Sequence, residues 1–200
     1  MLTVYHLEKS RSERILWLLE ELGVPYHLER FARDATGRAS EAYRKVHPLG
    51  KSPAIRDGDV VLAESGAIVE YLLERYGEGR LAPAPGSPAR ARYLYWFHSA
   101  EGTAMLWIVV SIILGMAGDA TAPLRSVLGG EIDRFFDYME AELGDGPYLT
   151  GESFSAADVM MGYVADVADE RGHLVNHPKL RAYLTRLRER PAYRRAKQHG

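Results

Sequence analysis

An α/β domain followed by an all-helical domain is the fold class that the sequence predicts. Strand-like runs alternate with helical periodicity over residues 1–80, a segment rich in proline and small residues follows at 81–88, and only helical periodicity appears over 89–200. The predicted order of the first domain is βαβαββα. The segment 81–88 is therefore interpreted as a linker between two domains.

The first domain opens with a strand at residues 2–7 and a helix whose leucines and isoleucine recur at helical spacing over 15–22. Gly23 and Pro25 end that pattern. The remaining elements expected in this domain are a strand at 26–31, a short helix at 41–46, strand-like runs at 54–55 and 60–62, and a helix at 65–76 that ends at Gly77.

The two short runs at 54–55 and 60–62 are joined by Asp57-Gly58-Asp59, a strong hairpin signal. Pro53 stands before the first run, where it is expected to fix the strand edge, as a cis bond in a tight turn. An extended ligand would then pair with the backbone of Ser52.

A Glu-Ser pair stands after the hairpin, where the next helix is expected to begin. Backbone amides at a helix start bind carboxylates, so Ser65 and these amides would take a carboxylate while Glu64 pairs with an ammonium group. An amino-acid head group carries both charges. The alternatives are that Pro53 only opens a strand, that Ser65 is an ordinary N-cap, and that Glu64 is an acid favoured by the helix dipole.

Helical signals fill the second domain. The expected helices cover about 89–116, 124–143 and 178–190, and a fourth begins at Ser155, whose spacing to Asp158 is that of a capping box.

Composition excludes several functions. There is no cysteine, which rules out disulfides, thiolate metal ligands and a protein thiol as nucleophile. A net charge of -2 gives no general attraction to nucleic acid or to anionic membranes. The apolar run at 104–116 is shorter than the ~20 residues that span a bilayer. No secretory signal is visible at the amino terminus, so a cytoplasmic protein is expected. No metal site is expected either.

Three motifs, Gly50-Lys-Ser-Pro-Ala, Glu64-Ser-Gly-Ala-Ile and Phe154-Ser-Ala-Ala-Asp158, resemble those of the cytosolic glutathione S-transferases in order and approximate spacing. The resemblance extends over nearly the whole chain. It implies a thioredoxin-like domain that binds glutathione as co-substrate, a helical domain with the site for a hydrophobic electrophile, and a homodimer.

The resemblance also assigns residues. It implies that the cysteinyl backbone of glutathione lies on Ser52 before Pro53, and that the γ-glutamyl head lies on Glu64 and Ser65. The ammonium of Lys51 would reach the glycine carboxylate, unless it is a solvated hairpin lysine.

Arg38 stands where some related classes place a further basic ligand, but the length of the preceding loop varies.

The thiol of glutathione needs a group that stabilises its thiolate. Ser10, in the loop after the first strand, resembles the active-site serine of the serine-type classes, although with Glu13 it also has capping-box spacing. Ser12 is the next candidate. Several classes use a tyrosine at the end of the strand, but the spacing puts His6 there, so Tyr5 is expected in the core. His6 would touch the site or fill the strand end.

The sequence therefore predicts a glutathione transferase acting on hydrophobic electrophiles. The alternatives are a non-catalytic module that binds glutathione or another protein, and a glutathione-dependent peroxidase or isomerase on the same fold.

Overall fold

The computed structural model describes residues 1–199 and divides into two compact units. The first contains Met1–Ala82 together with the residues from Arg188 onward, and the second contains Pro83–Leu187. The segment from Arg188 onward thus differs from the domain prediction, which assigned all of 89–200 to the helical domain.

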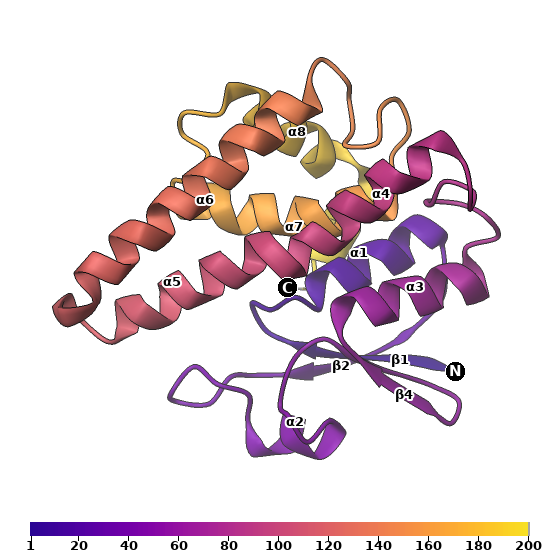
Figure 1. Cartoon of the computed structure of the whole chain (residues 1–200). Helices are drawn as coiled ribbons and strands as arrows, with labels where there is room; N and C mark the ends of the chain where they lie inside the picture. Colours follow the sequence, from indigo (N-terminus) through magenta and orange to yellow (C-terminus); the bar gives the residue numbers. More distant parts are fainter. Residues whose placement is uncertain (200) are drawn as a thin grey trace. The chain divides into compact units, whose positions relative to one another are not determined.

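The first unit is built in the predicted order βαβαββα and confirms the thioredoxin-like fold (Figure 1). Its elements are β1 (Leu2–Leu7), α1 (Glu13–Leu22), β2 (His27–Phe31), α2 (Glu41–Val46), β3 (Ala54–Asp57), β4 (Val60–Ala63), α3 (Ser65–Tyr76) and the carboxyl-terminal α9 (Pro191–Lys197). Helices α1 and α3 lie on one face of the sheet and α2 lies on the other.

The sheet has the strand order β2-β1-β3-β4, in which β1 pairs with β2 in parallel and with β3 antiparallel. Tyr5 is opposite Ala54, and Ala54 is opposite Ala63 on the antiparallel strand β4. Because these three positions share one row of the sheet, the end of β1, the start of β3 and the end of β4 meet at the same edge. The loops that leave this edge carry the predicted site residues.

Helix α1 is the central packing element of the first unit. Ile15, Leu16, Leu18 and Leu19 have no exposed surface. Helix α9, which the sequence interpretation missed, packs against α1: the ring of Tyr193 meets that of Trp17 edge-on, with 5.1 Å between centroids.

An ion pair also stabilises the contact between α9 and α1. Arg190 donates to both carboxylate oxygens of Glu21, at 2.6 and 2.8 Å, just before α9 begins. A bidentate pair of this kind has strict geometry, so it fixes the direction in which the chain enters α9. These contacts with α1 explain why the residues from Arg188 onward belong to the first unit.

The second unit is helical throughout its regular structure. Its elements are α4 (Pro88–Ser99), the π-helical segment η1 (Ala100–Met105), α5 (Leu106–Met116), the short 3-10 segment η2 (Asp119–Thr121), α6 (Ala122–Leu143), α7 (Ala156–Glu170) and α8 (Pro178–Glu189), whose last residues belong to the first unit.

Helix α7 forms the core of this unit and begins with the predicted capping box. The carboxylate of Asp158 is fully buried and accepts four hydrogen bonds of 2.8–3.0 Å, from the backbone amides of Leu149 and Ser155 and from the hydroxyls of Ser155 and Tyr183. Burial raises the pKa of this carboxyl, while the four donors act in the opposite direction. Asp158 therefore joins a loop, a helix start and a second helix.

Helices α4, η1 and α5 run on without a break from Pro88 to Met116. This 29-residue helix has a mean hydropathy of 1.6 in its most apolar window, enough to cross a membrane by length and composition alone. The apolar run at 104–116 therefore forms the end of the long helix that was expected over about 89–116. Core helices of soluble proteins pass the same criterion, so the helix is weak evidence for a membrane span.

Candidate active site

Two serines from distant parts of the sequence meet at the sheet edge. Ser10 lies in the loop between β1 and α1, and Ser52 lies just before β3. Their hydroxyl oxygens are 2.8 Å apart, and both side chains are largely buried, with 7% and 8% of their surface exposed. The peptide bond between Ser52 and Pro53 is cis, as the sequence predicted. The structure thus brings the predicted catalytic serine to the predicted backbone-binding edge.

Ser12 and His6 continue this contact inward. The hydroxyl oxygen of Ser12 lies 2.8 Å from that of Ser10 and 2.8 Å from Nδ1 of His6. Neither Ser12 nor His6 has exposed surface. Four side chains therefore form a continuous hydrogen-bonded row, which we call the serine row: His6, Ser12, Ser10 and Ser52.

The imidazole of His6 is neutral at physiological pH. Burial, together with the smaller effects of Arg30 and His199 and against that of Glu8, lowers its pKa to about 4. A buried ring without charge fits a hydrogen-bonding role better than a proton-transfer role near pH 7.

Ser10 does not form the capping box that its spacing to Glu13 suggested. The backbone amide of Glu13 bonds to the carbonyl of Ser10, not to its hydroxyl. The Glu13 carboxylate pairs with Lys197 of α9 at 2.6 Å. The hydroxyl of Ser10 accepts instead from the amide of Ser12, at 3.3 Å. The capping box with Glu13 is therefore absent, although the bond from the amide of Ser12 is of the kind that a capping serine makes near a helix start.

Tyr5 lies in the core, as the strand alternation predicted. It packs with Tyr43 and Ala54, and its hydroxyl accepts from Nε of Arg56 at 3.0 Å. It is adjacent to His6 in the strand, and neighbouring strand residues face opposite sides of a sheet. Its hydroxyl is thus occupied away from the serine row.

The start of α3 lies on the same edge. Glu64 is the N-cap, with an exposed side chain and a positive φ of 75°, a conformation that costs a non-glycine residue about 1–3 kcal/mol. The first bond within the helix runs from the amide of Ile68 to the carbonyl of Glu64. The amides of residues 65–67 precede that bond and point out of the helix start. Ser65 follows directly and is buried.

Lys51 and Arg38 are exposed. Lys51 is adjacent to Ser52 in the chain and so lies at the same edge. Arg38 lies in the loop before α2, where its backbone amide donates to Asp34.

Arg33 is a residue that the sequence interpretation missed. Its guanidinium donates to the carbonyls of Glu8 and Lys9, at 2.9 and 2.7 Å, and to that of Gly37 at 2.8 Å. These bonds hold the loop that leads into Ser10. No local motif signals the contact, because Arg33 lies more than twenty residues further along the chain.

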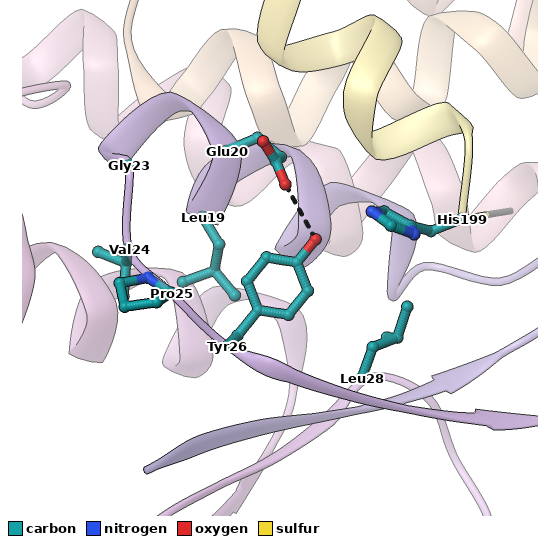
Figure 2. Close-up of a pocket in the computed structure, with 8 residues that line it drawn as sticks. All are labelled: Leu19, Glu20, Gly23, Val24, Pro25, Tyr26, Leu28 and His199. Carbon is teal, nitrogen blue, oxygen red and sulfur yellow. Dashed lines mark hydrogen bonds between the residues drawn. The ribbon is translucent and has the colours of Figure 1, made fainter.

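A cavity of about 460 Å³ lies elsewhere in the first unit, between the end of α1, the start of β2 and the carboxyl terminus (Figure 2). The hydroxyl of Tyr26 in its wall donates to Glu20 at 3.1 Å, and burial raises the pKa of that hydroxyl, so it stays protonated. None of the predicted site residues lines this cavity, whose walls are formed by Leu19, Glu20, Gly23, Val24, Pro25, Tyr26, Leu28 and His199. Within residues 1–199 no group of three or more histidine and carboxylate side chains is arranged for a metal ion.

Comparison with known proteins is consistent with this geometry. The chain matches the family model of the glutathione S-transferase N-terminal domain over residues 1–74 and that of the C-terminal domain over 120–186. It is 33% identical to glutathione S-transferase 3 of Schizosaccharomyces pombe, over 97% of this chain and 86% of the relative. The chain belongs to the glutathione S-transferase family. Its function is glutathione transfer.

Solved structures of glutathione S-transferases share the fold. One from Actinobacillus pleuropneumoniae superposes with a TM-score of 0.90 at 31% identity, over 100% of this chain and 92% of that one. A family member from Pseudomonas fluorescens, solved with two glutathione bound, gives a TM-score of 0.83 at 25% identity, over 98% and 91%. The recognition of the family from three sequence motifs is confirmed.

Proposed function

We propose that this transferase binds glutathione in an extended conformation at the edge where Ser52 and Pro53 lead into β3. The γ-glutamyl head would lie at the start of α3, with its carboxylate on Ser65 and the outward-facing amides and its ammonium on Glu64. The glycine carboxylate would pair with Lys51. The Pseudomonas fluorescens family member was solved with glutathione bound, which supports glutathione as the co-substrate here.

We further propose that the hydroxyl of Ser10 donates a hydrogen bond to the thiolate sulfur. The observation that carries this assignment is the 2.8 Å contact between the hydroxyls of Ser10 and Ser52. A cysteinyl residue whose backbone pairs with Ser52 would place its sulfur at this contact. Ser10 then exchanges its bond to Ser52 for one to the sulfur.

The chemistry follows from the charge on sulfur. A free thiol has a pKa of about 8.5, so it is mostly protonated at neutral pH. A hydroxyl that donates to the thiolate lowers this pKa, because it stabilises only the charged form. The thiolate lone pair then attacks an electrophilic carbon of the second substrate and forms a carbon–sulfur bond; with an activated aryl halide, the carbon–halogen bond breaks and halide leaves with its electron pair. Holding both substrates together lowers the barrier further. Ser10 is a hydrogen-bond donor in this scheme and not a nucleophile.

Besides glutathione, the proposed partners are a hydrophobic electrophile and a second copy of this chain, and the proposed location is the cytoplasm. These proposals are based on the family to which the chain belongs. Light scattering of the purified protein tests the dimer, for which a mass near 45 kDa is expected from the 22.4 kDa chain. A mass of one chain would contradict it.

The Ser10→Ala variant tests the catalytic assignment. A hydrogen bond to a charged group contributes about 1.5–3 kcal/mol, and 1.36 kcal/mol corresponds to one pKa unit. The pKa of bound glutathione, followed by the ultraviolet absorbance of its thiolate, should therefore rise by roughly 1–2 units. Conjugation of an activated aryl halide at pH 6.5 should fall roughly 10–100-fold.

Two control variants sharpen the test. Ser126→Ala removes an exposed hydroxyl on α6, and Tyr5→Phe removes a hydroxyl that is bonded to Arg56; both should leave the thiolate signal unchanged. A Ser10→Ala variant with unaltered thiolate absorbance and activity would show the assignment to be wrong. A loss of signal in Tyr5→Phe would move the donor to Tyr5.

A further inference from the structure

The serine row ends on a buried histidine that the transfer chemistry above does not use. His6 lies near the end of β1, paired with Arg30 of β2, and its ring has no exposed surface. Nδ1 contacts the hydroxyl of Ser12 at 2.8 Å, while Nε2 has no hydrogen-bond partner among residues 1–199. The ring therefore makes one hydrogen bond, and that bond belongs to the serine row.

Each hydroxyl in the row has a single proton and donates only one bond. When every hydroxyl donates within the row, all the bonds of the row run in the same direction. In the outward direction Nδ1–H of His6 donates to Ser12, Ser12 donates to Ser10, and Ser10 donates outward. In the inward direction Ser12 donates to Nδ1, Ser10 donates to Ser12, and Ser10 has no proton left for a sulfur atom. The proton position on one imidazole decides which direction is present.

The unpartnered Nε2 selects between the two directions. In the inward direction the neutral ring carries its proton on Nε2, which leaves a buried N–H donor without an acceptor. In the outward direction Nε2 carries only a lone pair, and unpaired buried acceptors are tolerated more readily than unpaired N–H donors. The outward direction is therefore the more stable one.

The remaining contacts agree with that direction. The amide of Ser12 donates to the hydroxyl of Ser10 at 3.3 Å, so this oxygen already receives bonds from within the protein. Ser12 has a second acceptor, the carbonyl of Leu7, but at 3.5 Å this bond is longer than the 2.8 Å contact with Ser10. The free proton of Ser10 is thus the one that points to Ser52 and to any group that displaces it.

We propose that His6 is a positioning residue whose Nδ1–H sets the direction of the serine row, so that Ser10 directs its proton to the sulfur of glutathione. This inference rests on the proposed role of Ser10. His6 touches neither substrate and transfers no proton; it acts through Ser12.

The charge state of the ring leaves this role intact over the working pH range. Burial lowers the pKa of His6 to about 4; the charged or titratable groups that face it are Arg30, Glu8 and His199. Nδ1 carries a proton in this neutral tautomer and in the imidazolium alike. The direction of the row is therefore independent of pH above and below the pKa of the ring.

A pair of variants tests the proposal. His6→Leu removes the donor, whereas His6→Asn keeps an N–H donor close to the position of Nδ1. We expect the pKa of bound glutathione to rise by roughly half the Ser10→Ala shift, about 0.5–1 unit, in His6→Leu and to stay near the wild-type value in His6→Asn. Conjugation at pH 6.5 should fall roughly 3–10-fold in His6→Leu, with KM for glutathione nearly unchanged. His27→Leu, an exposed histidine of the same sheet, is the matched control.

Three readouts separate positioning from general damage to the fold. At pH values above the shifted thiol pKa the rate of His6→Leu should return to that of the wild type, since all bound glutathione is then ionised. In the Ser10→Ala background His6→Leu should cause no further shift. Nitrogen NMR of the folded wild-type protein should find the proton of His6 on Nδ1.

Several results would overturn the proposal. These are a proton on Nε2, an equal rate defect of His6→Leu at every pH, or additive shifts in the double variant. If His6→Leu does not fold, two other measurements decide the question. One is the tautomer of His6 seen by NMR. The other is the Ser12→Ala variant, which removes the hydroxyl between His6 and Ser10 and should also raise the pKa of bound glutathione. An unchanged thiol pKa in Ser10→Ala would instead refute the proposed role of Ser10 itself.

Discussion

The buried imidazole of His6 should make the stability of this protein depend on pH. In the unfolded chain a histidine titrates near pH 6.5, whereas burial lowers the pKa of His6 to about 4 in the folded protein. Between these two values the unfolded state binds a proton that the folded state does not. Stability should therefore fall as the pH drops from 6.5 to 4 and should be constant, as far as this group is concerned, above pH 6.5.

The magnitude follows from the two pKa values. Their difference of about 2.5 units corresponds to about 3.4 kcal/mol, of which about 3 kcal/mol is expressed by pH 4. Solvent entering the site would reduce this figure, which is thus an upper value. It is nonetheless a large part of the ~5–15 kcal/mol by which typical domains are stable.

Urea unfolding at pH 7 and pH 4 measures this contribution, with His6→Asn as the non-titrating comparison. Both proteins are studied at the same concentration, because association would make stability depend on it. Carboxylates titrate equally in both, so their effect cancels. The loss of unfolding free energy between pH 7 and pH 4 should be smaller in His6→Asn by up to about 3 kcal/mol. An identical loss in the two proteins would refute the assignment of a buried neutral His6.

Substitutions at three further positions test other parts of the structure. Glu64→Gly should relieve the strain of a positive φ and raise the unfolding free energy by up to about 1 kcal/mol, while Glu64→Ala should not, yet both should weaken glutathione binding in calorimetry. Wild-type affinity in both would contradict the role of Glu64. Arg33→Ala should speed amide hydrogen exchange in the loop before Ser10, and unchanged exchange there would show that the loop needs no support from Arg33. Asp158→Ala should lower the unfolding free energy by about 3–5 kcal/mol in urea titration, because four buried donors lose their acceptor; a loss below about 1 kcal/mol would contradict this.

Local signals in the sequence were sufficient to predict the framework of the site. The Asp-Gly hairpin, the proline before β3 and the Glu-Ser helix start each depend on residues that are close in sequence. In the structure Pro53 and the start of α3 lie at the edge that carries the site, whereas the Asp-Gly turn joins β3 to β4 at the opposite edge. Ser155 and Asp158 form the predicted capping box for the same reason. Backbone geometry is dictated by neighbours along the chain, so such motifs carry over into structure.

The contacts that complete the site join residues that are far apart in sequence. Ser10 meets Ser52 across the sheet edge, and Arg33 reaches back to the loop before Ser10. Neither contact has a periodicity or motif, because each depends on how β1, β2 and β3 pair. The sequence left open whether Ser10 caps a helix and whether His6 touches the site. Tertiary packing brings both side chains into the serine row.

The packing of α9 on α1 was missed for a related reason. Its residues form only two helical turns, too few for a clear apolar period, and its position is fixed by Tyr193 on Trp17 and by Arg190 on Glu21. These partners lie at opposite ends of the chain. The unit to which a short terminal helix belongs is decided by its tertiary contacts. The amino-acid composition of the helix does not predict those contacts.

A crystal structure with glutathione bound tests the central claim most directly. The distance from the glutathione sulfur to the hydroxyl oxygen of Ser10 should lie within hydrogen-bonding range, about 3–3.5 Å, with the cysteinyl backbone paired to Ser52. The hydroxyl of Tyr5 should keep its hydrogen bond from Arg56, and the hydroxyl of Ser12 should keep its contact with Ser10 and make none with the sulfur. A sulfur atom bonded to Tyr5 or to Ser12, and distant from Ser10, would contradict the account.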